Sequence, residues 1–134
     1  MILASLEKHR DLGLLILRLG VGVMFIAHGA PKLIGGPERW AGVGGAMGNL
    51  GIAWAPAFWG LMAALSEAGG GVCLILGAAF RPACLLMAFT MMVATIHHLK
   101  AGDGLLGASH AIELGVVFLG LVFIGPGQHS IDKK

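Results

Sequence analysis

Four long apolar runs constrain the fold of this chain more than any other feature. Each run is close to the length of about 20 residues that a helix needs to cross the hydrocarbon core of a bilayer. A segment in lipid must satisfy its own backbone hydrogen bonds, and no alternating barrel pattern is present, so we expect helices. The predicted spans cover about 12–30, 56–79, 82–99 and 105–125.

Composition supports a membrane protein and excludes other classes. Of the 134 residues, 57% are hydrophobic and 12% are charged, whereas soluble domains carry about 25% charged residues. The net charge of +2 is dispersed, and no basic patch with interleaved aromatic residues indicates a nucleic-acid partner. We therefore predict an all-α integral membrane protein, a four-helix transmembrane bundle forming one domain over residues 1–134, with the lipid bilayer as its main partner.

The segment between the first and second spans predicts a short helix at the membrane interface. Pro37 suits the start of a helix. Trp40, Val43, Met47 and Leu50 then fall on one face at helical spacing. Glycines in the same stretch disfavour a helix, so a partly re-entrant loop is the alternative.

The distribution of lysine and arginine outside the spans predicts the orientation in the membrane. The side of the termini carries Lys8, Arg10, Arg81, Lys133 and Lys134. The opposite side carries Lys32, Arg39 and Lys100. Because cytoplasmic loops carry the excess of positive charge, we expect both termini in the cytoplasm.

Polar side chains interrupt the apolar runs and mark a candidate site. A charge at the bilayer centre costs about 2.5–3.5 kcal/mol on insertion scales, so such residues usually face the bundle interior. Counted along the helices, Glu67 and Glu113 lie at similar depth. Arg18 is long enough to reach towards either carboxylate and serve as their counter-charge. The predicted polar site consists of Arg18, His28, Glu67, His97, His110 and Glu113.

Small residues beside these polar positions predict helix–helix interfaces. On the last span, His110 and Glu113 share a face at i, i+3, which Gly107 and Gly120 continue. Close approach of helices in membranes favours such small residues. A second stripe, next to Glu67 on the second span, contains Gly60, Ala64, Ala68 and Gly71.

Three interpretations of the polar site stay open from the residues alone. In the first, buried polar pairs only fix the helix register. In the second, a quinone-like or other small ligand binds, Glu67 and Glu113 exchange protons or bind it as catalytic carboxylates, and the histidines line the outer mouth. In the third, imidazole and carboxylate groups hold Zn, Cu or Fe. The metal-ligand candidates are His28, His97, His98, His110, Glu67 and Glu113.

Several motifs, in the same order along nearly the whole chain, resemble the DoxX family of small membrane proteins. The first is LLILRLGVGVMFIAHGAPKL at Leu14–Leu33, and the second is LSEAGGGVCLILGAAFRPACLLMAF at Leu65–Phe89. The third is TIHHLKAG at Thr95–Gly102, and the last is ELGVVFLGLVFIGPGQHSID at Glu113–Asp132. The chain has Gln128–His129 where Arg-Tyr is frequent in the family.

The resemblance implies a four-helix protein of the bacterial inner (cytoplasmic) membrane with a link to redox chemistry. Relatives include a subunit of a terminal quinol oxidase and a subunit of a thiosulfate:quinone oxidoreductase. The family's intramembrane polar positions correspond to Arg18, His28, Glu67, His97 and Glu113.

The leading functional hypothesis is a component of redox or quinone/quinol metabolism, such as a subunit of a quinone-linked oxidoreductase with a membrane or redox partner subunit. One alternative is a non-enzymatic membrane scaffold or assembly partner. The other is a metal-binding membrane protein. A homo-oligomer is compatible with each of these.

Overall fold

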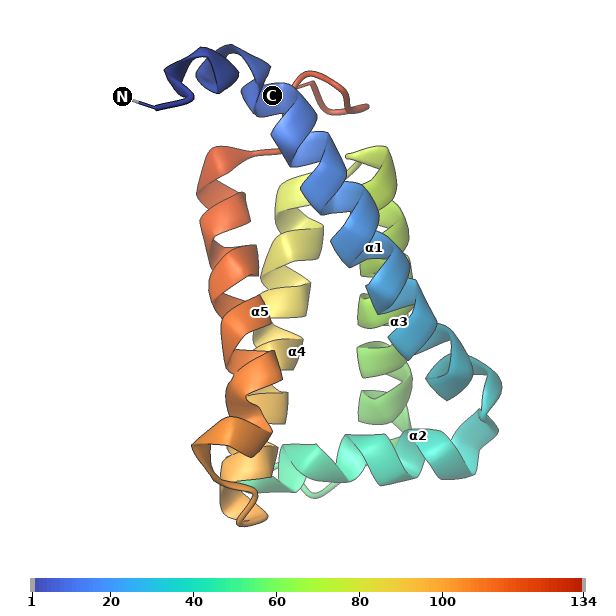
Figure 1. Ribbon diagram of the computed structural model, residues 1–134. Helices are drawn as coiled ribbons and strands as arrows, with labels where there is room; N and C mark the ends of the chain where they lie inside the picture. The colour runs from blue at the N-terminus through green and yellow to red at the C-terminus, as the bar shows by residue number, and fades with distance from the viewer. Residues whose placement is uncertain (1, 134) are drawn as a thin grey trace.

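The chain folds into four long helices and a short helical segment that crosses one end of them. A computed structural model describes residues 2–133. The elements are η1 (Ala4–His9), α1 (Arg10–Ile34), α2 (Gly36–Gly44), η2 (Gly45–Leu50), α3 (Pro56–Leu76), α4 (Phe80–Lys100) and α5 (Gly104–Ile124). Both termini lie at one end, and α2 lies at the other (Figure 1). The all-α four-helix fold is therefore confirmed.

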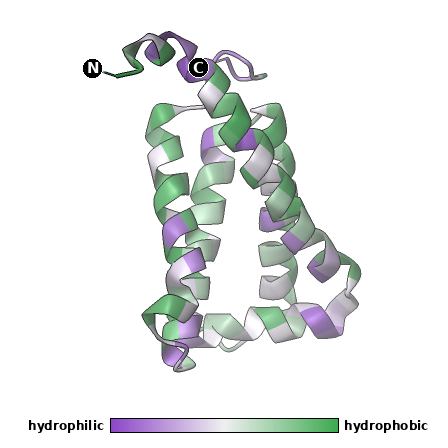
Figure 2. Cartoon of the chain, in the orientation of Figure 1, coloured by the Kyte–Doolittle hydropathy of each residue, from purple (hydrophilic) through white to green (hydrophobic). Residues whose placement is uncertain are grey.

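The long helices have the length and composition of membrane spans. Four helices, with η1 and α1 continuous over Ala4–Ile34, are apolar enough to cross a membrane. Figure 2 shows that hydrophobic residues predominate along them, with isolated hydrophilic turns inside. The bounds agree with the predicted spans to within a few residues, except at the end of the first.

The first span continues beyond its predicted end at Ala30. Pro31 directly follows that predicted end, but α1 runs on to Ile34, and the N–H of Gly35 still donates to the carbonyl of Pro31 at 3.0 Å. A proline removes one backbone hydrogen bond and its ring crowds the carbonyl four residues before it, yet membrane helices tolerate it. As a consequence Lys32 belongs to the span instead of to a loop.

Glycines bring α1 and α3 into backbone contact. A Cβ added to Gly22 would lie 2.8 Å from the carbonyl oxygen of Gly71, and one added to Gly29 would lie 2.5 Å from the backbone nitrogen of Ala68. Such distances leave no room for a side chain, so the helices meet as closely as glycine allows. This crossing sets the last turns of α1 against the middle of α3.

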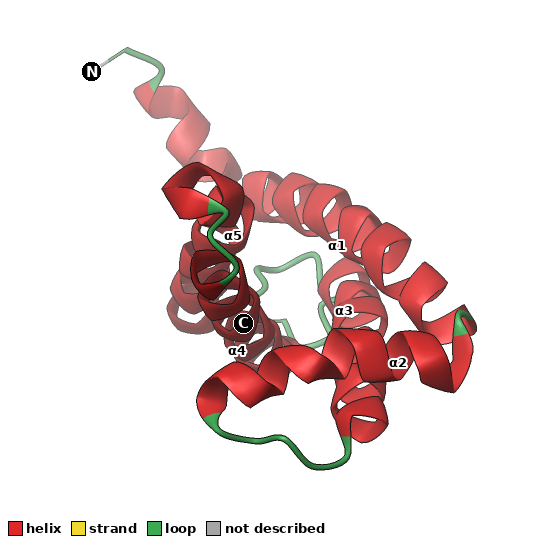
Figure 3. Ribbon diagram, turned by 90° about the horizontal axis from the view of Figure 1, so that it is seen from below, coloured by secondary structure: helices red, strands yellow, loops and turns green. Residues whose placement is uncertain are grey.

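A second glycine contact fixes α2 on α3. A Cβ on Gly60 would collide with the carbonyl of Trp40, and one on Gly44 would collide with the carbonyl of Pro56. The view along the bundle shows α2 crossing its end (Figure 3). The stripe of small residues predicted on the second span is thus a packing surface within the chain, used by α1 and α2.

The predicted interfacial helix is present, divided between α2 and η2. Of its predicted apolar face, Met47 is buried and Trp40 and Val43 are half-buried, whereas Leu50 is exposed. The face therefore packs against the bundle through most of its length. The indole N–H of Trp40 also donates to the carbonyl of Lys32 at 3.0 Å, which ties α2 to the end of α1.

The remaining helices pack as a second pair, α4 with α5. Among the described residues, no Cα of α1 lies within 8 Å of a Cα of α5. Large side chains span this separation, and the rings of Phe25 and Phe118 meet edge to face at 5.1 Å between centroids. The two helix pairs therefore enclose interior space towards the α2 end.

Candidate functional site

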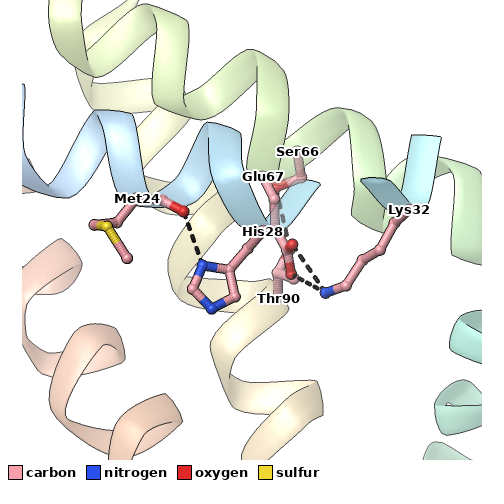
Figure 4. A network of polar contacts seen from close by, with 6 residues as sticks. All are labelled: Met24, His28, Lys32, Ser66, Glu67 and Thr90. Atoms are coloured by element: carbon pink, nitrogen blue, oxygen red, sulfur yellow. Dashed lines mark hydrogen bonds and ion pairs between the residues drawn. The ribbon is translucent and has the colours of Figure 1, made fainter. Parts of the chain in front are cut away.

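An ion pair between α1 and α3 lies at the centre of the candidate site. Lys32 Nζ lies 3.0 Å from Oε1 and 2.9 Å from Oε2 of Glu67. The side chain of Glu67 is 7% exposed and that of Lys32 is 26% exposed. Figure 4 shows Lys32 extending from α1 to the carboxylate on α3. The buried charge of Glu67 is thereby neutralised inside the bundle, as a charge within a membrane requires.

A large groove borders this ion pair. It has a volume of about 850 Å³ and lies between α3 and α4, with residues of α2 and η2 at one end. Its lining is mostly apolar. The polar lining residues are Lys32, Ser66, Glu67, Thr90, His97 and His98.

The groove is open towards lipid along its length. Leu65 of α3 and Leu86 and Phe89 of α4 line it and are also exposed on the surface of the spans. Deeper in, the hydroxyl groups of Ser66 and Thr90 lie 3.1 Å apart across the groove, one on each helix (Figure 4). An apolar molecule from the bilayer could therefore reach polar groups without passing through water.

One polar atom near the groove has no partner. The indole nitrogen Nε1 of Trp59 is buried, and no described residue accepts its hydrogen bond. Trp59 lines the groove. A buried donor without an acceptor is unusual in folded proteins, so a ligand oxygen is a natural candidate to satisfy it.

A smaller cavity of about 190 Å³ reaches the same ion pair from α1, α4 and α5. Lys32, Glu67 and His98 line both the cavity and the groove. The cavity also contains His28 and His110, whose rings stack at 5.7 Å between centroids. The ion pair is thus approached both by an apolar groove and by a cavity rich in histidine.

Neighbouring groups orient the histidines. Nδ1 of His28 lies 2.8 Å from the carbonyl oxygen of Met24 and donates to it, which leaves Nε2 free. Nδ1 of His98 lies 2.7 Å from Oδ2 of Asp103. His97 lines the groove and lies 3.3 Å from the side-chain nitrogen of Asn49.

Arg18 lies elsewhere, at the end of the bundle that carries the termini. Its side chain is 1% exposed and donates four hydrogen bonds to backbone carbonyls. The acceptors are Leu74 at 2.8 Å, Ile75 at 2.8 Å, Pro126 at 3.1 Å and His129 at 2.8 Å. Two of these carbonyls belong to the last turn of α3, where the helix dipole favours a cation.

The predicted role of Arg18 as counter-charge to the glutamates is therefore wrong. The partner of Glu67 is Lys32, and Arg18 binds the chain end instead. Glu113 is exposed, lines neither cavity and forms no ion pair with any residue in 2–133. Glu67 and Glu113, which were predicted to belong to one polar site, therefore lie apart. Phe118 faces the core five residues later, and five residues rotate a helix by about 140° net, which turns Glu113 outwards.

The C-terminal motif GPG-x-x-S-x-D docks on the turn between α3 and α4. The backbone N–H of Phe80, at the start of α4, donates to the carboxylate of Asp132 at 2.9 Å. The N–H of Ile131 donates to the carbonyl of Leu76 at 3.1 Å. Gly77 has φ +64°, and a Cβ there would collide with Ser130. The motif therefore has a structural role. We call the hydrogen bonds of Arg18 to Leu74, Ile75, Pro126 and His129 the Arg18 clasp.

The candidate metal ligands do not form a metal site. Within residues 2–133, no group of three or more His, Cys, Asp or Glu side chains is placed to hold a metal ion. The rings of His28 and His110 stack instead of converging on one point. The donor set therefore does not fit Zn, Cu or Fe.

Sequence reasoning missed four residues of the site: Lys32, Trp59, Ser66 and Thr90. Lys32 follows His28 by four residues and so shares its helix face, but it was excluded because the first helix was expected to end at Ala30. The hydroxyl residues carry no signal of their own in a helix, where they commonly bond the preceding turn, as Thr90 does to the carbonyl of Leu86.

The fold and the site define a class of protein: a small multi-pass membrane protein with an ion pair inside the bundle and a groove open to lipid. The chain belongs to the DoxX family, whose family model matches residues 13–99. No solved structure matches the chain.

Three relatives match almost over their full length. A protein of Haemophilus influenzae, described as uncharacterized, is 33% identical, with 97% of this chain and 96% of the relative covered. The inner membrane protein YqjF of Escherichia coli is 30% identical, with 96% and 95% covered. The inner membrane protein YphA of Escherichia coli is 30% identical, with 93% and 91% covered. These findings support a multi-pass protein of the inner membrane.

Proposed function

We propose that the protein binds a quinone or quinol in the groove between α3 and α4 and takes part in quinone-linked redox metabolism. The observation that carries this proposal is the ion pair of Lys32 and Glu67 on the wall of a groove of about 850 Å³ that is open to lipid. Small-molecule sites typically have volumes of about 300–1,000 Å³, an apolar lining and a few polar groups that fix orientation.

The residues that line the groove suit both the apolar tail and the polar ring of a quinone. Apolar side chains such as Leu65, Leu86 and Phe89 would hold the isoprenoid tail on the lipid side. The ammonium of Lys32 has three N–H donors, two of which point to Glu67, so one remains for a ring carbonyl. The unsatisfied N–H of Trp59 offers a further donor to the groove.

In this proposal Glu67 exchanges protons with a bound quinol. Its carboxylate accepts hydrogen bonds and reaches both the groove and the histidine-lined cavity. His98 shares both spaces, and His28 and His110 line the cavity alone. In this proposal Glu113 does not touch the ligand. An electron-transfer partner subunit would oxidise the bound quinol or reduce the bound quinone.

Titration of the purified chain in nanodiscs with decylubiquinone tests this function, with quenching of tryptophan fluorescence as the signal. The wild type is expected to show saturable quenching, because Trp59 lines the groove. The double variant K32L/E67L removes both charges together and so leaves neither one buried alone. A hydrogen bond to a charged group contributes about 1.5–3 kcal/mol, so we expect the affinity to fall at least about tenfold.

Two further variants make the titration interpretable. Ala63→Phe fills the groove without touching the ion pair and should also reduce binding. Glu38→Gln, on the exposed surface of α2, removes a carboxylate outside the groove and should bind as the wild type does. Quenching that rises linearly with quinone in every variant would show partition into lipid only and would contradict the proposal.

We also propose that both termini face the cytoplasm, on the strength of the lysine and arginine distribution. The common position of both termini at one end of the bundle is compatible with this (Figure 1). A C-terminal reporter that is active only in the cytoplasm should be active, and a periplasmic reporter at that position should be silent.

A further inference from the structure

The carboxylate of Glu113 lies on the outer surface of a membrane span. It is the tenth residue of α5 (Gly104–Ile124), so it lies near the middle of the helix. It is exposed, and no hydrogen bond or ion pair joins it to another described residue. An ionisable side chain at such a depth normally faces protein or a water-filled cavity, because contact with lipid costs several kcal/mol.

The surrounding face of α5 has the features of a helix–helix contact, yet among the described residues no helix packs against Gly120, and His110 is exposed although its ring stacks on His28 of α1. His110, Glu113 and Gly120 are all exposed on this face. A Cβ added to Gly120 would have nothing within 4 Å, in contrast to Gly22, where backbone of a neighbouring helix lies within van der Waals distance. Within residues 2–133, the single chain therefore contains no helix that packs on this face of α5 around Glu113 and Gly120.

We propose that this face, defined by His110, Glu113 and Gly120 on α5, is an intramembrane interface with a second copy of the chain. The carboxylate of Glu113 would accept a hydrogen bond from His110 of the partner subunit, and the reverse pair would form by symmetry. This proposal does not rest on the proposed quinone site, although His110 also lines the small cavity beside Glu67.

Charge complementarity argues for a second copy as the occupant. A two-fold interface brings the same patch of both subunits together, so the patch must contain its own complement. This patch does, because the acceptor at Glu113 and the donor at His110 lie one helical turn apart on one face. In two parallel α5 helices, that offset lets each carboxylate meet an imidazole one turn away, while Gly120 lets the backbones approach.

Single-molecule photobleaching of the labelled chain in liposomes, over a range of protein-to-lipid ratios, measures the association. The wild type is expected to dimerise, whereas Glu113→Leu and His110→Leu should each weaken the dimer. Each substitution removes both hydrogen bonds of the symmetric interface, so we expect about a tenfold weakening or more. Glu38→Gln, on α2, is the matched control and should leave the dimer unchanged.

Disulfide cross-linking locates the interface and keeps the test valid if a leucine variant folds poorly. Gly120→Cys should form a disulfide with the same residue of a second copy in native membranes. Leu85→Cys, which is exposed on α4, should not. The unsubstituted chain, with its free Cys73 and Cys84, gives the background.

Three results would overturn the proposal. One is a wild type that stays monomeric at every protein-to-lipid ratio. Another is a dimer of unchanged strength in Glu113→Leu together with no cross-link at Gly120→Cys. The third is a cross-link at Gly120→Cys that joins the chain to a different membrane protein and not to a second copy.

Discussion

At the scale of single residues, two cations inside the spans are satisfied in different ways. Lys32 neutralises Glu67 beside open cavities, where a ligand could share its donors. Arg18 binds only backbone carbonyls and lines neither cavity. The planar guanidinium, with five donors in a fixed geometry, suits a clasp of several carbonyls better than the single ammonium of lysine. We therefore assign Arg18 to stability and Lys32 to the site.

The clasp makes a prediction about stability. Arg18→Met should leave the carbonyls of Ile75, Pro126 and His129 without their donor, while that of Leu74 keeps the N–H of Gly77, and each buried unsatisfied group costs about 1–3 kcal/mol. We expect a loss of at least about 3 kcal/mol in the free energy of unfolding, measured by SDS titration in mixed micelles. Arg39→Met, at an exposed position of α2, should change stability by less than about 0.5 kcal/mol. Equal stability of the two variants would show that the clasp contributes little.

At the scale of elements, the crossing of α1 and α3 sets the position of the ion pair. Gly29 lies three residues before Lys32 and packs against the backbone of Ala68, next to Glu67. The glycine contact therefore fixes the distance over which Lys32 must reach. Without close approach of these helices, the two charges would separate within a medium that penalises isolated charge.

The crossing predicts opposite effects of one substitution at two glycines of the same helix. Gly29→Ala places a Cβ 2.5 Å from the backbone of Ala68, so the helices must separate. We expect a loss of about 1–3 kcal/mol in stability, together with weaker quinone binding. Gly20→Ala meets nothing within 4 Å and should stabilise the helix by about 0.5–1 kcal/mol. Thermal unfolding and the decylubiquinone titration of both variants, side by side, check this; a neutral Gly29→Ala would contradict it.

Hydropathy was sufficient to predict where the helices lie in the sequence. It was not sufficient to predict which side of each helix faces the bundle interior. The spans, the all-α bundle and the interfacial segment follow from the apolar runs and their breaks, because lipid permits few structures. The side that each residue faces depends on packing between distant helices. Glu113 illustrates this, since its depth was predicted but its outward direction was not.

Two further features depended on contacts that the sequence pattern does not encode. The partners of Arg18 are backbone carbonyls, which every residue possesses, so no residue type marks them. Lys32 was missed because the first span was predicted to end at Ala30, whereas α1 continues to Ile34. The remaining expectations about the site, that Glu67 acts on a ligand and that histidines surround it, are proposals about a cavity whose lining includes these residues.

At the scale of the whole molecule, the two ends of the bundle differ in packing and in polar contacts. The end with the termini is closed by Arg18 and the C-terminal motif. The small cavity and the ion pair lie towards the end covered by α2, whereas the groove extends along α3 and α4 as far as Ala79 and Pro82. The groove opens between α3 and α4, whereas the proposed contact between copies lies on α5 and shares His110 with the small cavity.

The most direct test of the central claim, that the groove binds a quinone, is photolabelling of the protein in nanodiscs with an azido-quinone, followed by peptide mass spectrometry. We predict that the label concentrates on α3 and α4 around Ser66 and Thr90, and that excess decylubiquinone or the K32L/E67L change removes it. A label spread evenly over the lipid-facing surfaces of all four spans, and unaffected by competitor, would contradict the account.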